Sequence, residues 1–216
     1  MGGKRAVVVA AGAPPDLRLL RAAGRVADVV IAADGGFSHA RAAGLRVDVV
    51  IGDLDSLDQP LPAGVELVRH PRDKDATDLE LALDYVASAG PAEVVLFGAL
   101  GGRLDHMLAT LNLLERYEFP LVLRGAAETL YVVRDQVTVP ARLGDLVSLI
   151  SLSPRCSGIS TQGLHYPLRR GTLCRASTRG ISNQVTSLPC GVEVREGKLL
   201  VVHSPVPQRR RRRDQL

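Results

Sequence analysis

A regular alternation of short apolar runs with helical patterns over the first 120 residues constrains the fold most strongly. Apolar runs with the length of buried strands occupy residues 6–10, 29–32, 47–51, 65–68 and 94–97. Segments with apolar residues at helical spacing lie between them, at residues 17–23, 37–43, 79–87 and 104–117. Strands that alternate with helices predict an α/β domain with an open, Rossmann-like parallel sheet and crossover helices.

Beyond about Pro120 the helical periodicity ends, and short β-rich pieces follow. These pieces, separated by Gly and Pro, cover residues 121–123, 130–133, 137–139, 146–152, 184–188, 192–194 and 199–202. Such a series predicts a small all-β sandwich packed beside the first domain. We therefore expect an α/β nucleotide-binding catalytic domain over residues 1–124, a β-sandwich domain over residues 125–205 and a basic disordered tail over residues 206–216.

The formal net charge of +4 is concentrated in the tail. Five arginines at 209–213 and Asp214 account for all of it, so the rest of the chain is neutral. With aromatic residues at only 3%, the chain offers no base-stacking platform, and this composition argues against nucleic-acid binding.

Hydrophobic and cysteine patterns exclude other classes. No apolar run approaches the ~18 residues that cross a membrane. Cys156, Cys174 and Cys190 are odd in number and widely spaced, which argues against a disulfide framework or a zinc site. A cytoplasmic protein with buried free thiols is expected.

The first polar loop at the ligand-binding edge of the predicted sheet spans residues 52–56. Ligands of open parallel sheets bind beyond the carboxyl ends of the strands. Asp53 and Asp55 follow a strand directly, and residues two apart on an extended chain point the same way ~6.6 Å apart. Both carboxylates can reach one hard cation, and oxygen ligands favour magnesium over zinc. The alternative is that each aspartate only caps a turn.

A second polar loop, residues 74–80, precedes the helical pattern that starts near Asp78. Thr77 and Glu80 fit a capping box, so we assign this pair to helix capping. Asp78 suits the helix dipole, but capping does not require Lys74 beside it. Lys74 is therefore a candidate phosphate ligand, and Asp78 is a candidate third metal ligand.

The third loop, residues 98–106, has the outline of a phosphate site. Its glycines permit close backbone approach, a helix N-terminus follows, and Arg103 adds a bidentate charge. Asp105 and His106 strengthen this interpretation, although His106 alone fits a structural role equally well. Asp34, Gly35 and Gly36 form another acidic turn at the same edge. Neither a P-loop motif nor a G-x-G-x-x-G after a strand is present, which argues against a P-loop kinase and a dinucleotide dehydrogenase.

Taken together and in order, six motifs resemble those of the thiamine pyrophosphokinase family, whose members transfer pyrophosphate from ATP to thiamine and release AMP. The matching motifs cover nearly the whole chain, at residues 34–36, 52–56, 74–78, 101–106, 163–168 and 181–183. The resemblance implies an α/β nucleotide-binding domain followed by a β-sandwich. It also implies a homodimer with thiamine bound between the subunits.

The resemblance implies a role for each matching residue. Asp53, Asp55 and Asp78 would bind magnesium and, with Lys74, carry the chemistry. The ATP-binding residues would be Asp34, Gly35, Gly36, Arg103, Asp105 and His106, and the thiamine pyrimidine would lie against Ser182 and Asn183. The general base is left open between cluster aspartates such as Asp55 and Asp75.

Two alternatives use the same fold. One is a pyrophosphokinase for another alcohol, such as a hydroxymethylpterin, since a fold and a metal site need not fix the acceptor. Residues 163–168 and the Ser182-Asn183 pair favour thiamine. The other is a non-catalytic protein that binds nucleotides or nucleic acids through its arginine tail. The intact aspartates argue against an idle site.

Overall fold

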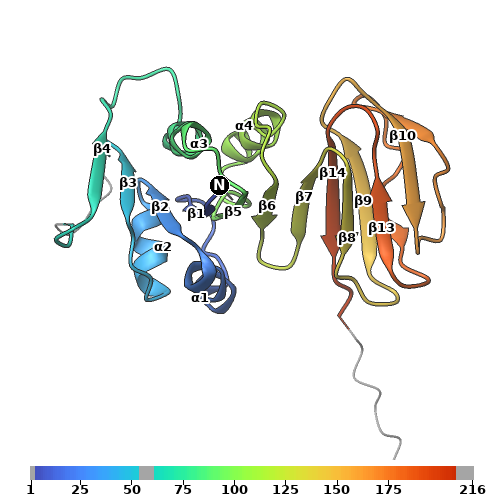
Figure 1. Ribbon diagram of the computed structural model, residues 1–216, viewed down its shortest axis with the longest axis horizontal. Coiled ribbons are helices and arrows are strands. Elements are labelled where there is room, and N and C mark those ends of the chain that lie inside the picture. The colour runs from blue at the N-terminus through green and yellow to red at the C-terminus, as the bar shows by residue number, and fades with distance from the viewer. Residues whose placement is uncertain (1–2, 54–60, 208–216) are drawn as a thin grey trace, which may run out of the picture.

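In the computed structural model, residues 3–53 and 61–207 are described (Figure 1). Their main feature is a ten-stranded sheet, and the strands at one end of it are parallel. In spatial order these are β4 (Glu66–Arg69), β3 (Val49–Gly52), β2 (Val29–Ala33), β1 (Arg5–Val9), β5 (Glu93–Phe97) and β6 (Leu121–Arg124). The predicted α/β architecture with parallel strands is confirmed for this part.

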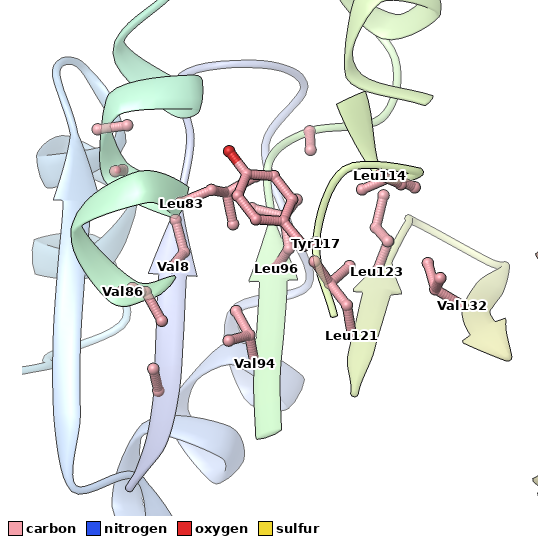
Figure 2. Packing of buried hydrophobic residues seen from close by; sticks show 14 of the residues in the cluster. Val8, Leu83, Val86, Val94, Leu96, Leu114, Tyr117, Leu121, Leu123 and Val132 are labelled. Atoms are coloured by element: carbon pink, nitrogen blue, oxygen red, sulfur yellow. The ribbon is translucent and has the colours of Figure 1, made fainter. Parts of the chain in front are cut away.

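Helices cover both faces of the parallel strands. On one face lie α1 (Leu17–Val26) and α2 (Gly36–Ala42), and on the other α3 (Asp78–Ser88) and α4 (Leu104–Leu113) (Figure 1). Successive residues of β1 point to opposite faces, so Val7 and Val9 pack with Leu20, whereas Val8 packs with Leu83 (Figure 2). Burial of both faces explains why these strands are apolar runs without polar alternation.

Beyond β6 the sheet becomes antiparallel and continues into a β-rich unit. The continuing strands are β7 (Thr129–Val133), β14 (Leu199–Ser204), β9 (Leu146–Ser151) and β12 (Asn183–Gln184). A second sheet packs on them, with the order β11 (Gly171–Cys174), β10 (Arg155–Gln162), β13 (Cys190–Glu193) and β8 (Gln136–Val139). The predicted β-rich unit is confirmed, but one of its two layers is a continuation of the α/β sheet, which is mixed.

Several local predictions differ from the structure. Strand β11 was not predicted, and the strand expected over residues 184–188 is only Asn183–Gln184. The helix expected to reach Tyr117 ends at Leu113, and a turn over residues 114–116 leads the chain into β6. Strand β10 was missed because its sequence is polar and its two-residue alternation is interrupted by a register shift near Gly158, a residue with φ +66°. Cys174 is exposed, although Cys156 and Cys190 are buried free thiols as expected.

Several predictions from the sequence concern residues or boundaries that the structure does not test. Residues 54–60, with Asp55, and the tail residues 208–216 lie outside the described residues. The domain boundaries stay predictions. Among the described residues, no helix is both long and apolar enough to span a membrane.

A buried hydrogen-bonded pair, His203 and Asp145, anchors the segment that follows β14. His203 Nε2 lies 2.9 Å from Asp145 Oδ2, and both side chains are buried. Backbone N–H groups of Arg142 and Val206 also donate to the Asp145 carboxylate. Burial alone would raise the pKa of Asp145, but these hydrogen bonds hold the pKa below its ordinary value.

This lowered pKa gives a pH-dependent prediction. A carboxyl group with a depressed native pKa stabilises the fold above its unfolded pKa of ~3.9, and the effect is lost as the pH falls through the native pKa. Asp145→Asn should therefore lower the free energy of unfolding in urea by about 3 kcal/mol at pH 7. The gap to wild type should shrink below pH ~4. The exposed Asp135→Asn is the control, and a gap equal at pH 7 and pH 3 would contradict the prediction.

Candidate active site

A cleft of about 1060 Å³ opens at the carboxyl ends of the parallel strands. Its walls are the loops that follow β1, β2, β3 and β5 together with the facing sides of α3 and α4. In the sheet, β1 lies between β2 on one side and β5 on the other, so the chain builds the sheet outward from β1 in both directions. Such a point, where the strand order reverses, is where open α/β sheets bind ligands. The cleft is therefore the candidate active site.

Glycines allow the β1 and β5 loops to meet on the cleft floor. The Gly12 N–H donates to the Gly98 carbonyl at 2.8 Å. A Cβ on Gly12 would lie 2.3 Å from that carbonyl oxygen, and one on Gly98, which has φ +67°, would lie 2.2 Å from Ala10 O. Sequence reasoning missed the loop at residues 10–13. Its signal was a run of small residues directly after a strand.

Three acidic residues predicted for the site converge around Gly52. A Cβ on Gly52, which has φ +152°, would lie 3.2 Å from both Asp34 Cβ and Asp78 Oδ1. Lys74 Nζ lies 3.1 Å from Asp78 Oδ1 and 3.9 Å from Asp53 Oδ2. The structure thus brings residues from the ends of β2, β3 and the segment before α3 into one charged group. Glycine at 52 leaves room for that group.

Two carboxylate oxygens in this group lack hydrogen bonds. Asp34 Oδ1 and Asp78 Oδ1 are buried without a hydrogen-bond partner among the described residues, although Lys74 is in ion-pair range of Asp78. Asp34 also has φ +44°, a strained conformation of the kind that occurs at functional sites. Leaving a buried acceptor unsatisfied is costly. These oxygens are suited to a hard cation.

A complete metal site is not built from the described side chains alone. Within residues 3–53 and 61–207, no group of three His, Cys, Asp or Glu side chains has the arrangement to hold an ion. Magnesium, however, is usually held by one or two carboxylates and completed by substrate phosphates and water. The carboxylates of Asp53 and Asp78 fit that partial shell.

The loop before α4 provides groups for an anion. Gly101 and Gly102 have φ +76° and +75°, and the N-cap residue Arg103 makes no capping hydrogen bond with its side chain, although the Asp105 carboxylate accepts one from the His106 N–H. Arg103 lines the cleft and forms two hydrogen bonds with Asp105, of 3.1 Å from Nε and 2.6 Å from Nη2. Those hydrogen bonds lower the pKa of Asp105 to about 2. Asp105 is therefore an ionised partner of Arg103, and it is absent from the cleft lining, whereas His106 is part of it.

Two other predicted ATP contacts, Gly35 and Gly36, lie at the start of α2, and Gly36 has a packing role. Gly36 is buried at the start of α2, and a Cβ there would lie 2.0 Å from Val9 O. Neither Gly35 nor Gly36 lines the cleft among the described residues. The absence of a side chain at 36 lets α2 approach β1.

The α3 wall confirms one capping prediction and corrects another. Thr77 Oγ1 accepts a hydrogen bond from the Glu80 N–H, as predicted for an N-cap. The Glu80 side chain, however, pairs with Arg116 at 2.6 Å and does not close the capping box. Arg116 and Arg72 line the cleft and were missed. They lie away from the first residues after each strand, so the strand-end rule gave no signal for them.

The two predicted thiamine contacts lie far from the cleft on the same chain. Six strand-to-strand steps separate β1 from β12, which is ~29 Å along the sheet. Asn183 uses both ends of its amide on the backbone of Tyr166, at 2.7 and 3.0 Å. Ser182 is exposed and has φ +56°. One chain therefore does not bring Ser182 and Asp78 together.

Family models match most of the chain in two consecutive pieces. Residues 21–123 match the model described as thiamin pyrophosphokinase, catalytic domain. Residues 134–199 match the model described as thiamin pyrophosphokinase, vitamin B1 binding domain. The first piece contains most of the residues that line the cleft, all except residues 10–13, and the second contains β12.

Individual relatives agree with the family models. A thiamine pyrophosphokinase of Bacillus subtilis is 26% identical over 172 residues, which are 75% of this chain and 80% of the relative. Thiamine pyrophosphokinase 2 of Arabidopsis thaliana is 28% identical over 140 residues, 57% of this chain and 52% of the relative. The chain thus matches about half the length of that plant relative.

Solved structures share the fold. A thiamin pyrophosphokinase of Geobacillus thermodenitrificans superposes with a TM-score of 0.76 at 28% identity, covering 94% of this chain and 99% of that one. The Bacillus subtilis structure gives a TM-score of 0.78 at 24% identity, with 94% and 100% covered. The mixed sheet and the β-rich unit therefore recur together in these structures.

Proposed function

Because the chain belongs to the thiamine pyrophosphokinase family, we propose that its cleft transfers pyrophosphate from ATP to thiamine, giving thiamine diphosphate and AMP. The chain is an ATP:thiamine diphosphotransferase by family. The observation that carries the assignment to this cleft is the convergence of Asp34, Asp53, Asp78 and Lys74 at the strand edge. No feature of the described residues favours a pterin acceptor or a non-catalytic role.

We propose magnesium as the divalent metal that an ATP-using transferase requires. Asp53 and Asp78 would hold it, with Asp34 beside them and the phosphates completing the shell. Asp55, the third predicted ligand, lies outside the described residues. When bound, magnesium would neutralise phosphate charge and orient the β-phosphorus for attack.

The other cleft residues fit the charge changes of the reaction. Pyrophosphoryl transfer through a loose transition state mainly needs alignment and charge stabilisation. Lys74, only 14% exposed, supplies a fixed positive charge beside the carboxylates. Arg103 and the N-terminus of α4 supply N–H donors at the opposite loop. We assign Lys74 and Arg103 to the phosphates.

We propose that thiamine binds between two copies of the chain. Ser182 and Asn183 lie ~29 Å from β1 along the sheet, so they reach a cleft only on another subunit. Exposed Tyr166 and Ile181 beside them give that edge apolar surface. Asn183 would hold the 166 loop in place, and the Ser182 hydroxyl would face thiamine.

Finer features of organisation are also proposals. The reversal of strand order at β1 and β5 supports a Rossmann-like nucleotide domain. The two family-model ranges support a boundary near residues 124–125. Use of ATP, together with three free cysteines, fits a cytoplasmic location.

Product analysis tests the proposed function. Purified protein incubated with ATP, magnesium and thiamine should give equal amounts of AMP and thiamine diphosphate. A parallel reaction with a hydroxymethylpterin as the acceptor should give no product. Pterin diphosphate without thiamine diphosphate would reject the thiamine assignment, and ATP binding without any product would favour the non-catalytic alternative.

Ser182→Gly tests the thiamine contact separately. Glycine tolerates the positive φ of this position, so the variant removes the CH2OH side chain without straining the backbone. Loss of one hydrogen bond should raise the KM for thiamine about tenfold and leave the KM for ATP unchanged. Ser177→Gly, on the same unit, is the control. An unchanged KM for thiamine would place the acceptor elsewhere.

A further inference from the structure

A short segment after α4, residues 115–118, joins the β-rich unit to the cleft. Cations from three places in the β-rich unit contact this junction segment: Arg134 after β7, Arg175 after β11 and Lys198 before β14. On its other side, the same segment contacts α3. The junction segment is thus held from both sides.

Lys198 makes the most buried of these contacts. The residue is 8% exposed, and its ammonium donates to the carbonyl of Tyr117 at 2.8 Å. The same ammonium donates to the carbonyl of Glu115 and to the carboxylate of Glu118. Three acceptors for three N–H groups satisfy a buried ammonium completely. This arrangement fixes the backbone on both sides of Arg116.

Arg116 carries the connection into the cleft. Its Nη1 lies 2.6 Å from Glu80 Oε1, and its Nη2 lies 2.8 Å from Asp84 Oδ2. Arg116 and Glu80 both line the cleft. Tyr117 adds a second link, because its hydroxyl donates to Asp84 at 2.9 Å. Burial, reinforced by the Asp84 hydrogen bond, raises the pKa of Tyr117 above its ordinary value, so this hydroxyl remains a donor.

The connection ends near the charged group of the site. Glu80 belongs to the first turn of α3, and that turn begins with Asp78. A shift of the junction segment would therefore move Arg116. Because Arg116 holds Glu80, the shift would also disturb the helical turn that carries Asp78. The side chain of Arg116 is 52% exposed, and besides Glu80 and Asp84 its guanidinium faces the ring of Tyr117, with 5.7 Å to the centroid. Its position therefore depends on the backbone of the junction segment.

From these contacts we propose that Lys198 is a positioning residue for the transfer reaction: it fixes the junction segment so that Arg116 holds the α3 wall of the ATP cleft. Lys198 does not line the cleft among the described residues and acts through Arg116. The proposal rests on the proposed function in one respect, because the KM for ATP is measured in the formation of thiamine diphosphate. The β-rich unit thereby takes part in nucleotide binding as well as in the proposed thiamine site.

A double-mutant cycle tests the proposal. Lys198→Met should raise the KM for ATP about tenfold with a smaller change in kcat, because the cleft wall loses its fixed position. Arg116→Met should do the same, and the double variant should be no weaker than either single variant. The exposed Arg195→Met, from the β13–β14 connection, is the control and should match wild type. If Lys198→Met raises the KM for ATP by the same factor in the wild type and in Arg116→Met, the two residues act independently and the proposal is overturned.

Two further measurements keep the result interpretable. If Lys198→Met does not fold, Glu118→Gln replaces it in the cycle, since Glu118 is 65% exposed and the substitution weakens one of the three Lys198 contacts, together with the exposed ion pair of Glu118 with Arg134. The Kd for ATP in the presence of magnesium is measured by calorimetry for every variant. Coupling between Lys198 and Arg116 in this Kd supports the positioning role. If wild type forms no thiamine diphosphate, only the proposed function is rejected, and the positioning role is still judged from the Kd. Coupling absent from both KM and Kd rejects the positioning role.

Discussion

Asp78→Asn should lower the kcat for thiamine diphosphate formation by about 10³-fold, the size expected when a group that stabilises transition-state charge is removed. Asp78 contributes a buried carboxylate oxygen without a hydrogen-bond partner among the described residues, in contact with Lys74. Asparagine keeps the shape but removes the negative charge that a cation and Lys74 both require. The helix should persist, because its N-cap is Thr77.

The measurement is steady-state kinetics with AMP and thiamine diphosphate followed together. Asp73→Asn is the matched control, because Asp73 lies in the same loop but is exposed and outside the cleft lining. Thermal unfolding should give the same midpoint for wild type and both variants within a few degrees. A kcat for Asp78→Asn within tenfold of wild type would show that Asp78 is not required for the transfer reaction.

The acidic edge could be predicted because it follows from local rules. Buried parallel strands appear as apolar runs, and their carboxyl ends meet at one edge of the sheet. Asp34 and Asp53 follow such runs, Asp78 begins a helix, and the structure brings the three together around Gly52 and Lys74. The resemblance to the family, which rests on six motifs in the same order, then assigned these residues to one site. The role of Gly52 itself needed coordinates, because it depends on two carboxylates from distant segments.

The remaining features depend on long-range pairing that no local pattern encodes. Arg116 reaches α3 across 36 residues of sequence, and Lys198 reaches Tyr117 across 81. Beyond β7 the sheet continues through antiparallel pairing with the distant strand β14, as between Val133 and Leu199. A motif also does not separate binding from packing. Gly36 belongs to a family motif, yet its surroundings are backbone atoms of β1.

Gly36→Ala should therefore act on stability before it acts on binding. The added Cβ would lie 2.0 Å from Val9 O and 2.6 Å from Val9 C, and both are backbone atoms of a fully buried central strand. No side-chain rotation relieves such a contact, so α2 must move away from β1. Overpacking of this kind should lower the free energy of unfolding by about 3 kcal/mol in urea titrations.

Gly191→Ala gives the matched control for this substitution. Its Cβ would lie 3.8 Å from Gln162 Cβ, an ordinary contact, so the free energy of unfolding should change little. At a temperature where Gly36→Ala remains folded, the folded fraction should bind ATP with a Kd close to wild type, since Gly36 does not line the cleft. Wild-type stability combined with a weakened ATP affinity would instead identify Gly36 as a nucleotide contact. The two outcomes distinguish a glycine required for helix–strand packing from one required for phosphate approach.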